Sequence, residues 1–155
     1  MEIERKFLVK ELPSELSKFD FADIEQCYVD LGEEDEPEKR IRKLTRGGET
    51  SYFYTEKGEG DLCREEEEYE ITSYSYNNLK ELTVSEVIKK TRYYIPLVGD
   101  LTAELDIYGG TLEGLVTVEI EFPTLEASEG FAVPLWFGKE ITHDKNYKNK
   151  NLALR

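Results

Sequence analysis

The sequence LVTVEIEF at residues 115–122 ends in alternating charged and apolar side chains, and TAELDIY at residues 102–108 alternates in the same way. In an extended chain, Glu119 and Glu121 lie on one side and Ile120 lies on the other. A period of two is typical of a β-strand with one polar and one apolar face. These segments therefore predict two strands, each with an acidic face.

Short segments of this kind recur along the chain at fairly even spacing. We expect β-strands at residues 2–9, 23–30, 39–45, 50–57, 64–72, 87–95, 102–108 and 115–122. Eight short strands with this spacing predict an antiparallel sandwich or barrel. The fold class indicated by the sequence is α+β, mainly β.

Helical patterns are fewer and shorter than the strand patterns. We expect short helices at residues 13–18, 73–82, 128–137 and 144–154. In the last of these, Asp144 is the expected N-cap, and Tyr147, Leu152 and Leu154 are the expected docking residues. The acidic stretch GEEDEP at residues 32–37 is the most loop-like part of the chain.

The length and charge of the chain exclude several classes of protein. Its 155 residues predict one domain, residues 1–155. Lys and Arg total 20 against 34 Asp and Glu, so the net charge of −14 argues against nucleic-acid or membrane binding through a basic surface. The chain has no apolar run long enough for a membrane span and no signal-peptide pattern. Two cysteines, Cys27 and Cys63, then indicate a reduced, cytoplasmic protein.

Charge placement within the expected strands is the most informative feature. Six of the eight carry a like-charge pair two residues apart: Glu2 and Glu4, Arg40 and Arg42, Glu68 and Glu70, Lys90 and Arg92, Glu104 and Asp106, Glu119 and Glu121. A solvated outer face is the commonest location for charge. It usually mixes signs, however, because neighbouring like charges repel. A collected inner polar face is the other interpretation, and the pattern alone leaves both open.

An inward arrangement would bring these charges into one small volume. Residues two apart on a strand are separated by about 6.6–6.8 Å, and neighbouring strands by about 4.8 Å. Unpaired ions are too costly to bury dry, so such a channel must hold water, cations and an anion. Carboxylates suit Mg²⁺ or Mn²⁺, and Arg and Lys suit phosphate oxygens. The inward interpretation therefore predicts a metal–polyphosphate site.

The same residues carry a family resemblance that spans nearly the whole chain. The opening Glu2-Ile3-Glu4-Arg5-Lys6 resembles the ExExK signature of the CYTH superfamily, the triphosphate tunnel metalloenzymes. Further matching segments follow in the family's order: Arg40-Ile41-Arg42, Lys57, Glu68-Tyr69-Glu70, Lys90-Thr91-Arg92, Glu104-Leu105-Asp106, Glu119-Ile120-Glu121 and the tail at 144–149. The close spacing resembles the small bacterial, single-domain branch. This resemblance implies an eight-stranded, antiparallel, closed β-barrel with a few flanking helices.

The resemblance also implies roles for individual residues. The implied phosphate ligands are Lys6, Arg40, Arg42, Lys57, Lys90 and Arg92. The implied ligands of Mg²⁺ or Mn²⁺, at two sites, are Glu2, Glu4, Glu68, Glu70, Asp106, Glu119 and Glu121. Lys6 and Tyr28 are the implied catalytic residues, which orient the attacking water. Cys27 departs from the small residue expected at its position, so we expect it to narrow the barrel wall.

The implied activity is metal-dependent hydrolysis of a small-molecule triphosphate by a monomer or homodimer. The expected substrate is inorganic tripolyphosphate, cleaved to pyrophosphate and phosphate. Three alternatives stay open at this point. One is another enzyme of the same scaffold: a thiamine or nucleoside triphosphatase, or a class IV adenylyl cyclase. The second is a non-catalytic polyphosphate or nucleotide binding protein. The third is a structural β-domain with a mixed-charge surface.

Overall fold

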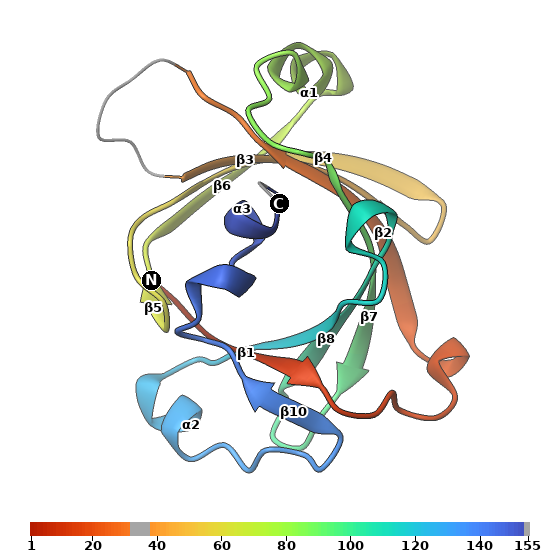
Figure 1. Ribbon diagram of the computed structural model, residues 1–155, viewed down its shortest axis with the longest axis vertical. Coiled ribbons are helices and arrows are strands. Elements are labelled where there is room, and N and C mark those ends of the chain that lie inside the picture. Colours follow the sequence, from red (N-terminus) through yellow and green to blue (C-terminus); the bar gives the residue numbers. More distant parts are fainter. Residues whose placement is uncertain (32–37, 154–155) are drawn as a thin grey trace.

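The alternating segments form an antiparallel sheet that curves into a nearly closed barrel (Figure 1). The computed structural model describes residues 1–31 and 38–153. Its strands are β1 (Glu2–Val9), β2 (Asp20–Tyr28), β3 (Glu38–Arg46), β4 (Glu49–Lys57), β5 (Cys63–Arg64), β6 (Glu66–Ile71), β7 (Ile88–Pro96), β8 (Thr102–Tyr108), β9 (Val116–Glu121) and β10 (Phe137–Glu140). All eight expected strands are present, and the mainly β, antiparallel fold class is confirmed. The expected count of eight is too low, because β5 and β10 are additional.

The barrel closes through the very short strand β5. The sheet runs in the order β10-β1-β9-β8-β7-β2-β3-β4-β6, and β5 pairs with β1 at its start. Only Glu2 and Ile3 of β1 pair with this strand, and the amide of Glu4 donates to the carbonyl of Leu62 at 3.0 Å. Gly60 makes the preceding turn at φ +130°, and a Cβ there would lie 2.1 Å from the Cys63 carbonyl oxygen. The turn that positions β5 therefore requires glycine.

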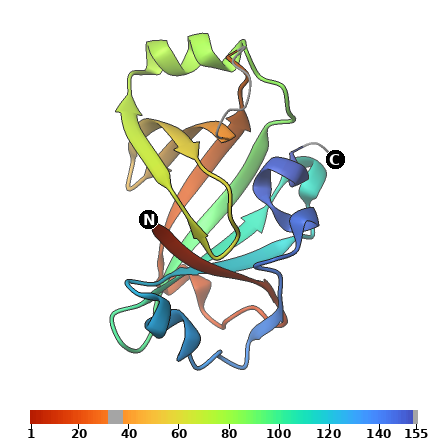
Figure 2. The same cartoon turned by 90° about the vertical axis from the view of Figure 1, so that its left-hand side faces the viewer.

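The main hydrophobic core lies outside the barrel rather than within it. Phe7, Leu105, Val118 and Ile120 are buried on the strand faces opposite the charged ones. The segment that contains α2 (Leu125–Glu129) and β10 covers them at one end of the molecule, opposite α1 (Figures 1 and 2). Because apolar packing is completed on the outer face, the inner face is free to carry polar groups.

A second outer core lies under helix α1 (Ser73–Lys80). Tyr76 of this helix packs with Ile41 and Cys27, all of which are buried. The Sγ of Cys27 lies 3.4 Å from the hydroxyl of Thr83. The expectation that Cys27 narrows the barrel wall is therefore wrong, because odd-numbered residues of β2 point outward.

Three of the four expected helices differ from those observed, two of them before the C-terminal segment. Residues 13–18 contain only the short 3₁₀ helix η1 (Leu16–Lys18). The helix expected at 128–137 is wrong: α2 begins earlier, where the Thr124 side chain accepts from the amide of Ala127, and residues 137–140 form β10 instead. Pairing of β10 with β1 overrides any local helical preference there.

The C-terminal segment contains two short helices in place of the single helix expected at 144–154. These are the 3₁₀ helix η3 (Lys145–Tyr147) and α3 (Asn149–Leu152). Asp144 is the N-cap of η3, as expected, since its side chain accepts from the amide of Asn146. Leu154 and the acidic stretch 32–37 lie outside the described residues. The remaining 3₁₀ helix is η2 (Gly110–Leu112).

The same C-terminal segment covers one mouth of the barrel. In Figure 1, η3 and α3 lie within the outline of the ring, and Figure 2 shows them on one side of it. Leu152 and Ala153 pack against Tyr28, Ile88 and Tyr108 on the inner face. Within the described residues, each helix is too short to cross a membrane.

Candidate active site

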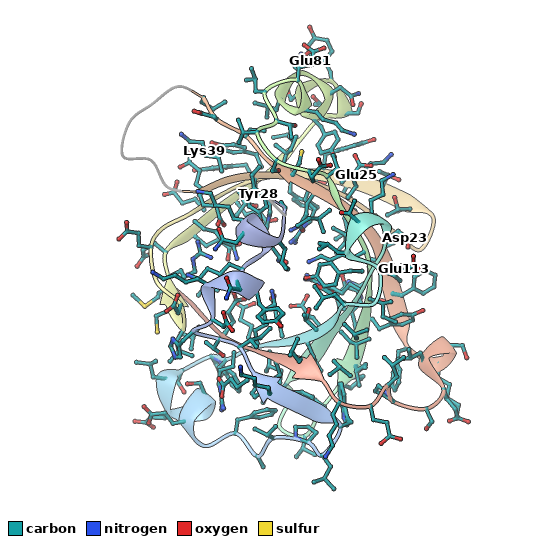
Figure 3. All side chains as sticks on the ribbon, viewed as in Figure 1. Asp23, Glu25, Tyr28, Lys39, Glu81 and Glu113 are labelled. Atoms are coloured by element: carbon teal, nitrogen blue, oxygen red, sulfur yellow. The ribbon has the colours of Figure 1, made fainter. Side chains whose placement is uncertain are left out.

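The inner faces of the strands enclose a cavity of about 340 Å³, which charged side chains line for the most part. Figure 3 shows the side chains that crowd into the ring of strands, including Tyr28. The following residues proposed from the sequence line this cavity: Glu2, Glu4, Lys6, Tyr28, Arg40, Arg42, Lys57, Glu68, Arg92, Glu119 and Glu121. These groups therefore face one shared channel, and the solvated outer face is not where they lie.

Strand register brings the acidic and basic groups together. Lys6 lies opposite Glu119 across the β1–β9 ladder, and Glu119 lies opposite Glu104 across the β8–β9 ladder. On another part of the wall, Arg40 lies opposite Tyr28. Side chains of even-numbered residues in β1, β2 and β3 share the inner face, because the alternation of each strand is kept in register with its neighbours.

Lys6 joins the acidic wall to the C-terminal segment. Its Nζ atom lies 3.6 Å from a carboxylate oxygen of Glu119 and donates a hydrogen bond of 2.7 Å to the backbone carbonyl of Tyr147. Burial alone raises the pKa of Glu119, but Lys6 and Arg92 outweigh it and lower the pKa to about 2. Glu119 is therefore ionised across the neutral range, as a metal ligand has to be.

Glu2 and Glu4 form the most crowded acidic part of the cavity. Burial, together with a hydrogen bond to Glu66, raises the pKa of Glu2 to about 7, although Lys57 lies 3.0 Å away. Burial and the charge of Glu119 raise the pKa of Glu4 to about 7 as well. Each pKa reports a carboxylate that lacks enough positive charge around it. A divalent cation with oxygen ligands would supply that charge, so these residues fit the metal that the resemblance implies.

Within residues 1–31 and 38–153, no three side chains of His, Cys, Asp or Glu are gathered closely enough to hold a metal ion. Mg²⁺ is commonly bound through one or two carboxylates, with waters and substrate phosphates completing its shell. The donor set therefore suits an ion that shares its ligands with a phosphate substrate.

We expect the metal-free protein to lose stability as the pH rises from about 5 to about 7. Glu2 and Glu4 have folded pKa values of about 7 against ordinary values of 4.5, so the folded state binds more protons than the unfolded state between these limits. Wherever the folded state binds more protons than the unfolded state, the free energy of unfolding falls as the pH rises. The lowered pKa values of Asp106 and Glu119 act only at lower pH, where both groups begin to protonate. The lowered pKa of Lys90 acts in the opposite direction, but only from about pH 7 upward.

Thermal unfolding in EDTA at a series of pH values measures this effect. Glu4→Gln should flatten the fall in Tm, and Mg²⁺ should restore stability most at the high end of the range, where both carboxylates are ionised. A Tm that stays constant or rises over this range, or an unchanged slope in Glu4→Gln, would contradict the assignment of raised pKa values to these groups.

The basic part of the cavity centres on β3. Both Nε and Nη2 of Arg42 donate to the side-chain oxygen of Gln26, at 3.1 and 2.9 Å. Nη2 of Arg40 donates to the hydroxyl of Thr55 at 3.3 Å. Burial, together with the charges of Arg40 and Arg92, lowers the pKa of Arg42 to about 10. Crowded cations of this kind are a favourable environment for a polyanion.

Lys90, Arg92 and Asp106 form a buried ionic cluster beside the cavity. Asp106 has an exposed fraction of 0% and lies 2.8 Å from Nζ of Lys90 and from Nε of Arg92. Burial alone raises the pKa of Asp106, but its two cationic partners hold it well below its ordinary value. Burial lowers the pKa of Lys90 to about 7 despite the attraction of Asp106. Lys90 and Asp106 are thus engaged with each other and are not among the lining residues.

Glu70 lies apart from the other proposed metal ligands. It is exposed on β6, opposite Phe53 of β4, and does not line the cavity. Glu68, two residues earlier, is also exposed but lines the cavity. The roles assigned to Glu70, Lys90 and Asp106 as direct ligands stay predictions.

Tyr28 lies between the arginines of β3 and the C-terminal segment that contains η3 and α3. It is buried, and it packs against Tyr108 and Leu152. Burial and the charge of Glu38 raise its pKa above the ordinary value, so the phenol keeps its proton. Its hydroxyl can therefore donate a hydrogen bond but cannot act as a base near neutral pH.

Several residues at the cavity were not assigned a role from the sequence. Glu38 lines the cavity and shares the inward parity of Arg40. Gln26 does not line it but holds Arg42, which does, and it shares the parity of Tyr28. Strand parity could have identified both. Asp61 lies in the loop before β5 and pairs with Lys148 of the C-terminal segment. No periodic pattern marks these last two residues, because their proximity depends on how the chain folds back on itself.

Comparison with known proteins supports the family indicated by this geometry. No protein-family model matches the chain. An inorganic triphosphatase of Nitrosomonas europaea is 40% identical over 153 residues, which cover 99% of this chain and 97% of the relative. An inorganic triphosphatase of Acetivibrio thermocellus is 38% identical over 115 residues, which cover 74% of this chain and 70% of the relative. The crystal structure of the inorganic triphosphatase NE1496 has a TM-score of 0.71 at 36% identity, with coverage of 100% of this chain and 95% of that one.

A nearly closed antiparallel barrel with acidic and basic groups on its inner face defines a triphosphate tunnel protein. With these relatives, the chain belongs to the inorganic triphosphatases of the CYTH superfamily. The resemblance stated from the sequence motifs is confirmed.

Proposed function

We propose that the protein hydrolyses inorganic tripolyphosphate to pyrophosphate and phosphate inside the barrel, with the aid of a divalent metal ion. The observation that carries this proposal is that Arg40 and Arg42 share one cavity with the crowded carboxylates of Glu2 and Glu4. The two arginines suit a polyanion, and the two carboxylates suit a cation bound to that polyanion. The relatives named inorganic triphosphatase support the same substrate.

The basic residues would bind the phosphate chain and spread its charge. Arg40 and Arg42 provide guanidinium groups that fit phosphate oxygens through paired N–H donors, whereas Lys57 and Lys6 provide point charges. Arg92 lines the same cavity but shares its charge with Asp106 and Glu104. Arg40 and Arg42 are therefore the principal phosphate ligands in this proposal. Lys90 would contribute only its charge, because it pairs with Asp106 and does not line the cavity.

The acidic residues that line the cavity would hold Mg²⁺ or Mn²⁺, at up to two positions. They are Glu2, Glu4, Glu68, Glu119 and Glu121. A bound divalent ion polarises phosphoryl oxygens and lowers the pKa of coordinated water. These carboxylates would hold that positive charge in the same cavity as the arginines, so that both could act on one phosphate chain.

Lys6 and Tyr28 would orient the attacking water. The Lys6 ammonium is held between Glu119 and the Tyr147 carbonyl, which leaves further N–H donors for the cavity. The Tyr28 phenol stays protonated and can donate to the water or to a phosphate oxygen. The water oxygen would form the new bond to the terminal phosphorus as the bridging P–O bond breaks and pyrophosphate leaves. The protons of the water would remain on the phosphate product, which then ionises in solution. Positioning and electrostatics supply most of the catalysis in such transfers.

A substrate-by-metal panel tests the proposal. Tripolyphosphate, ATP, thiamine triphosphate and pyrophosphate are each incubated with Mg²⁺, Mn²⁺ or Ca²⁺, and phosphate and cyclic AMP are measured. We expect the fastest phosphate release from tripolyphosphate with Mg²⁺ or Mn²⁺, and none in EDTA. Faster turnover of ATP or cyclic AMP formation would indicate a nucleotide enzyme of the same family. A rise in Tm with tripolyphosphate but no turnover with any metal would indicate a binding protein.

A further inference from the structure

The cations of the barrel interior fall into two groups according to the partner that holds them. Carboxylates hold most of them: Lys6 pairs with Glu119, Lys57 with Glu2, Arg64 with Glu38 and Arg92 with Asp106. Arg42 is held by an amide oxygen, and Arg40 by a hydroxyl. In the part of the chain that the structure describes, neither arginine has a carboxylate within ion-pair distance.

Gln26 is the residue that holds Arg42. It lies opposite Arg42 in the β2–β3 ladder, and its exposed fraction is 0%. One side-chain oxygen accepts from both Nε and Nη2, at 3.1 and 2.9 Å, which fixes the plane of the guanidinium group. The reverse amide orientation would turn the NH₂ group toward a cation, so electrostatics selects the orientation observed.

The contrast with Arg92 shows what a neutral partner accomplishes. Asp106 accepts from the same two nitrogens of Arg92, Nε and Nη2, at 2.8 and 2.9 Å, but with one carboxylate oxygen for each and with a full negative charge. That carboxylate fixes the side chain and also neutralises it. Gln26 fixes the orientation of Arg42 but leaves its positive charge free to attract an anion. Without Gln26, repulsion from Arg40 and Arg92 would turn the Arg42 side chain away from this orientation.

We infer that Gln26 is a positioning residue for substrate binding, which holds the Arg42 fork without cancelling the charge that the triphosphate requires. This inference rests on the proposed function, since it concerns how the same cavity binds its anion. It assigns to a neutral side chain a part of the binding specificity that the charged residues alone do not explain. Thr55 holds Arg40 in the corresponding way, although through a single hydrogen bond.

Two substitutions separate positioning from neutralisation. Gln26→Glu keeps an acceptor in the same place but adds a charge, so the KM for tripolyphosphate should rise at least about tenfold, with a smaller change in kcat. Gln26→Met removes the acceptor at similar volume, so kcat/KM should fall several-fold, less than in Gln26→Glu. Asn77→Asp, on the exposed face of α1, makes the same change in net charge away from the cavity and should leave both constants unchanged.

A binding measurement keeps the test independent of turnover. In EDTA, tripolyphosphate should raise the Tm of the wild-type protein, and this rise should shrink in Gln26→Glu even where its own Tm matches the wild type. A KM in Gln26→Glu within about twofold of the wild type, with a full rise in Tm, would overturn the inference. An inactive wild-type protein that still shows the Tm difference would overturn the proposed hydrolysis and uphold the role of Gln26.

Discussion

Replacing Asp106 with asparagine is expected to lower the free energy of unfolding by about 3–5 kcal/mol, because one partner is removed from a fully buried ionic cluster. Lys90 and Arg92 would both keep their buried positions and lose the carboxylate between them. Lys90 can release its proton, since burial already lowers its pKa to about 7. Arg92 cannot do so, and the uncompensated charge is the source of the loss. Urea denaturation of the metal-free protein measures it.

Glu104→Gln is the matched control for this substitution. Glu104 also pairs with Arg92, at 2.9 Å, but its side chain is 27% exposed, so water can replace the lost charge. Its substitution should cost less than about 1 kcal/mol. Equal losses in the two variants would show that burial of Asp106 is not what makes the cluster matter to stability.

The second large effect concerns turnover. Lys6→Gln and Glu119→Gln should each lower kcat for tripolyphosphate at least about tenfold, as the loss of a charge-stabilising group in a closed site does. The two side chains are 12% and 13% exposed and form an ion pair across the β1–β9 ladder, so each substitution also leaves the other charge without its partner. The double variant should therefore lose less than the product of the two single losses.

Lys10→Gln provides the control, because Lys10 follows the same strand but is exposed. It should keep wild-type turnover. Since Lys6 also contacts the Tyr147 carbonyl, the Tm of each variant has to be compared with its activity. Near-normal turnover of Lys6→Gln and Glu119→Gln in folded protein would refute the proposed site.

Much of the tunnel could be predicted from the sequence because parity is a local property. Glu119 and Glu121, or Arg40 and Arg42, must share a face in any strand, whatever packs against it. Which face turns inward was left open by the alternation, and the structure settles it: the apolar faces are buried outside the barrel, under α2 and β10. Alternation alone predicted either a sandwich or a barrel. The family resemblance of the motifs then indicated the barrel.

The additional strands could not be predicted in the same way. β10 has only four residues and contains Gly138, whose presence in a strand is unfavourable on its own. Glycine suits the close approach of the ladder here, since a Cβ at Gly138 would lie 3.0 Å from the carbonyl oxygen of Leu8. β5 is too short to produce any periodic signal. Both strands exist because β1 offers its free edge, which is a tertiary effect.

The sequence also could not predict which charged side chains are paired with each other and which line the cavity. Asp106 and Glu119 each belong to an acidic pair on the inner face of a strand, yet Asp106 is enclosed by two cations while Glu119 lines the cavity. The difference depends on cross-strand register, which places Arg92 opposite Asp106. Register of this kind is set by the whole sheet and cannot be read from one strand.

The two-residue junction between β5 and β1 determines where the ring separates most readily. Nine residue pairs join β3 to β4, whereas two join β5 to β1. Transient opening has the lowest free energy where the fewest interactions are lost, so amide hydrogen exchange should be faster at Ile3 than in the middle of β3. During such openings water and ions can reach the acidic end of the channel from the flank, while the packed layers at both ends of the molecule stay intact.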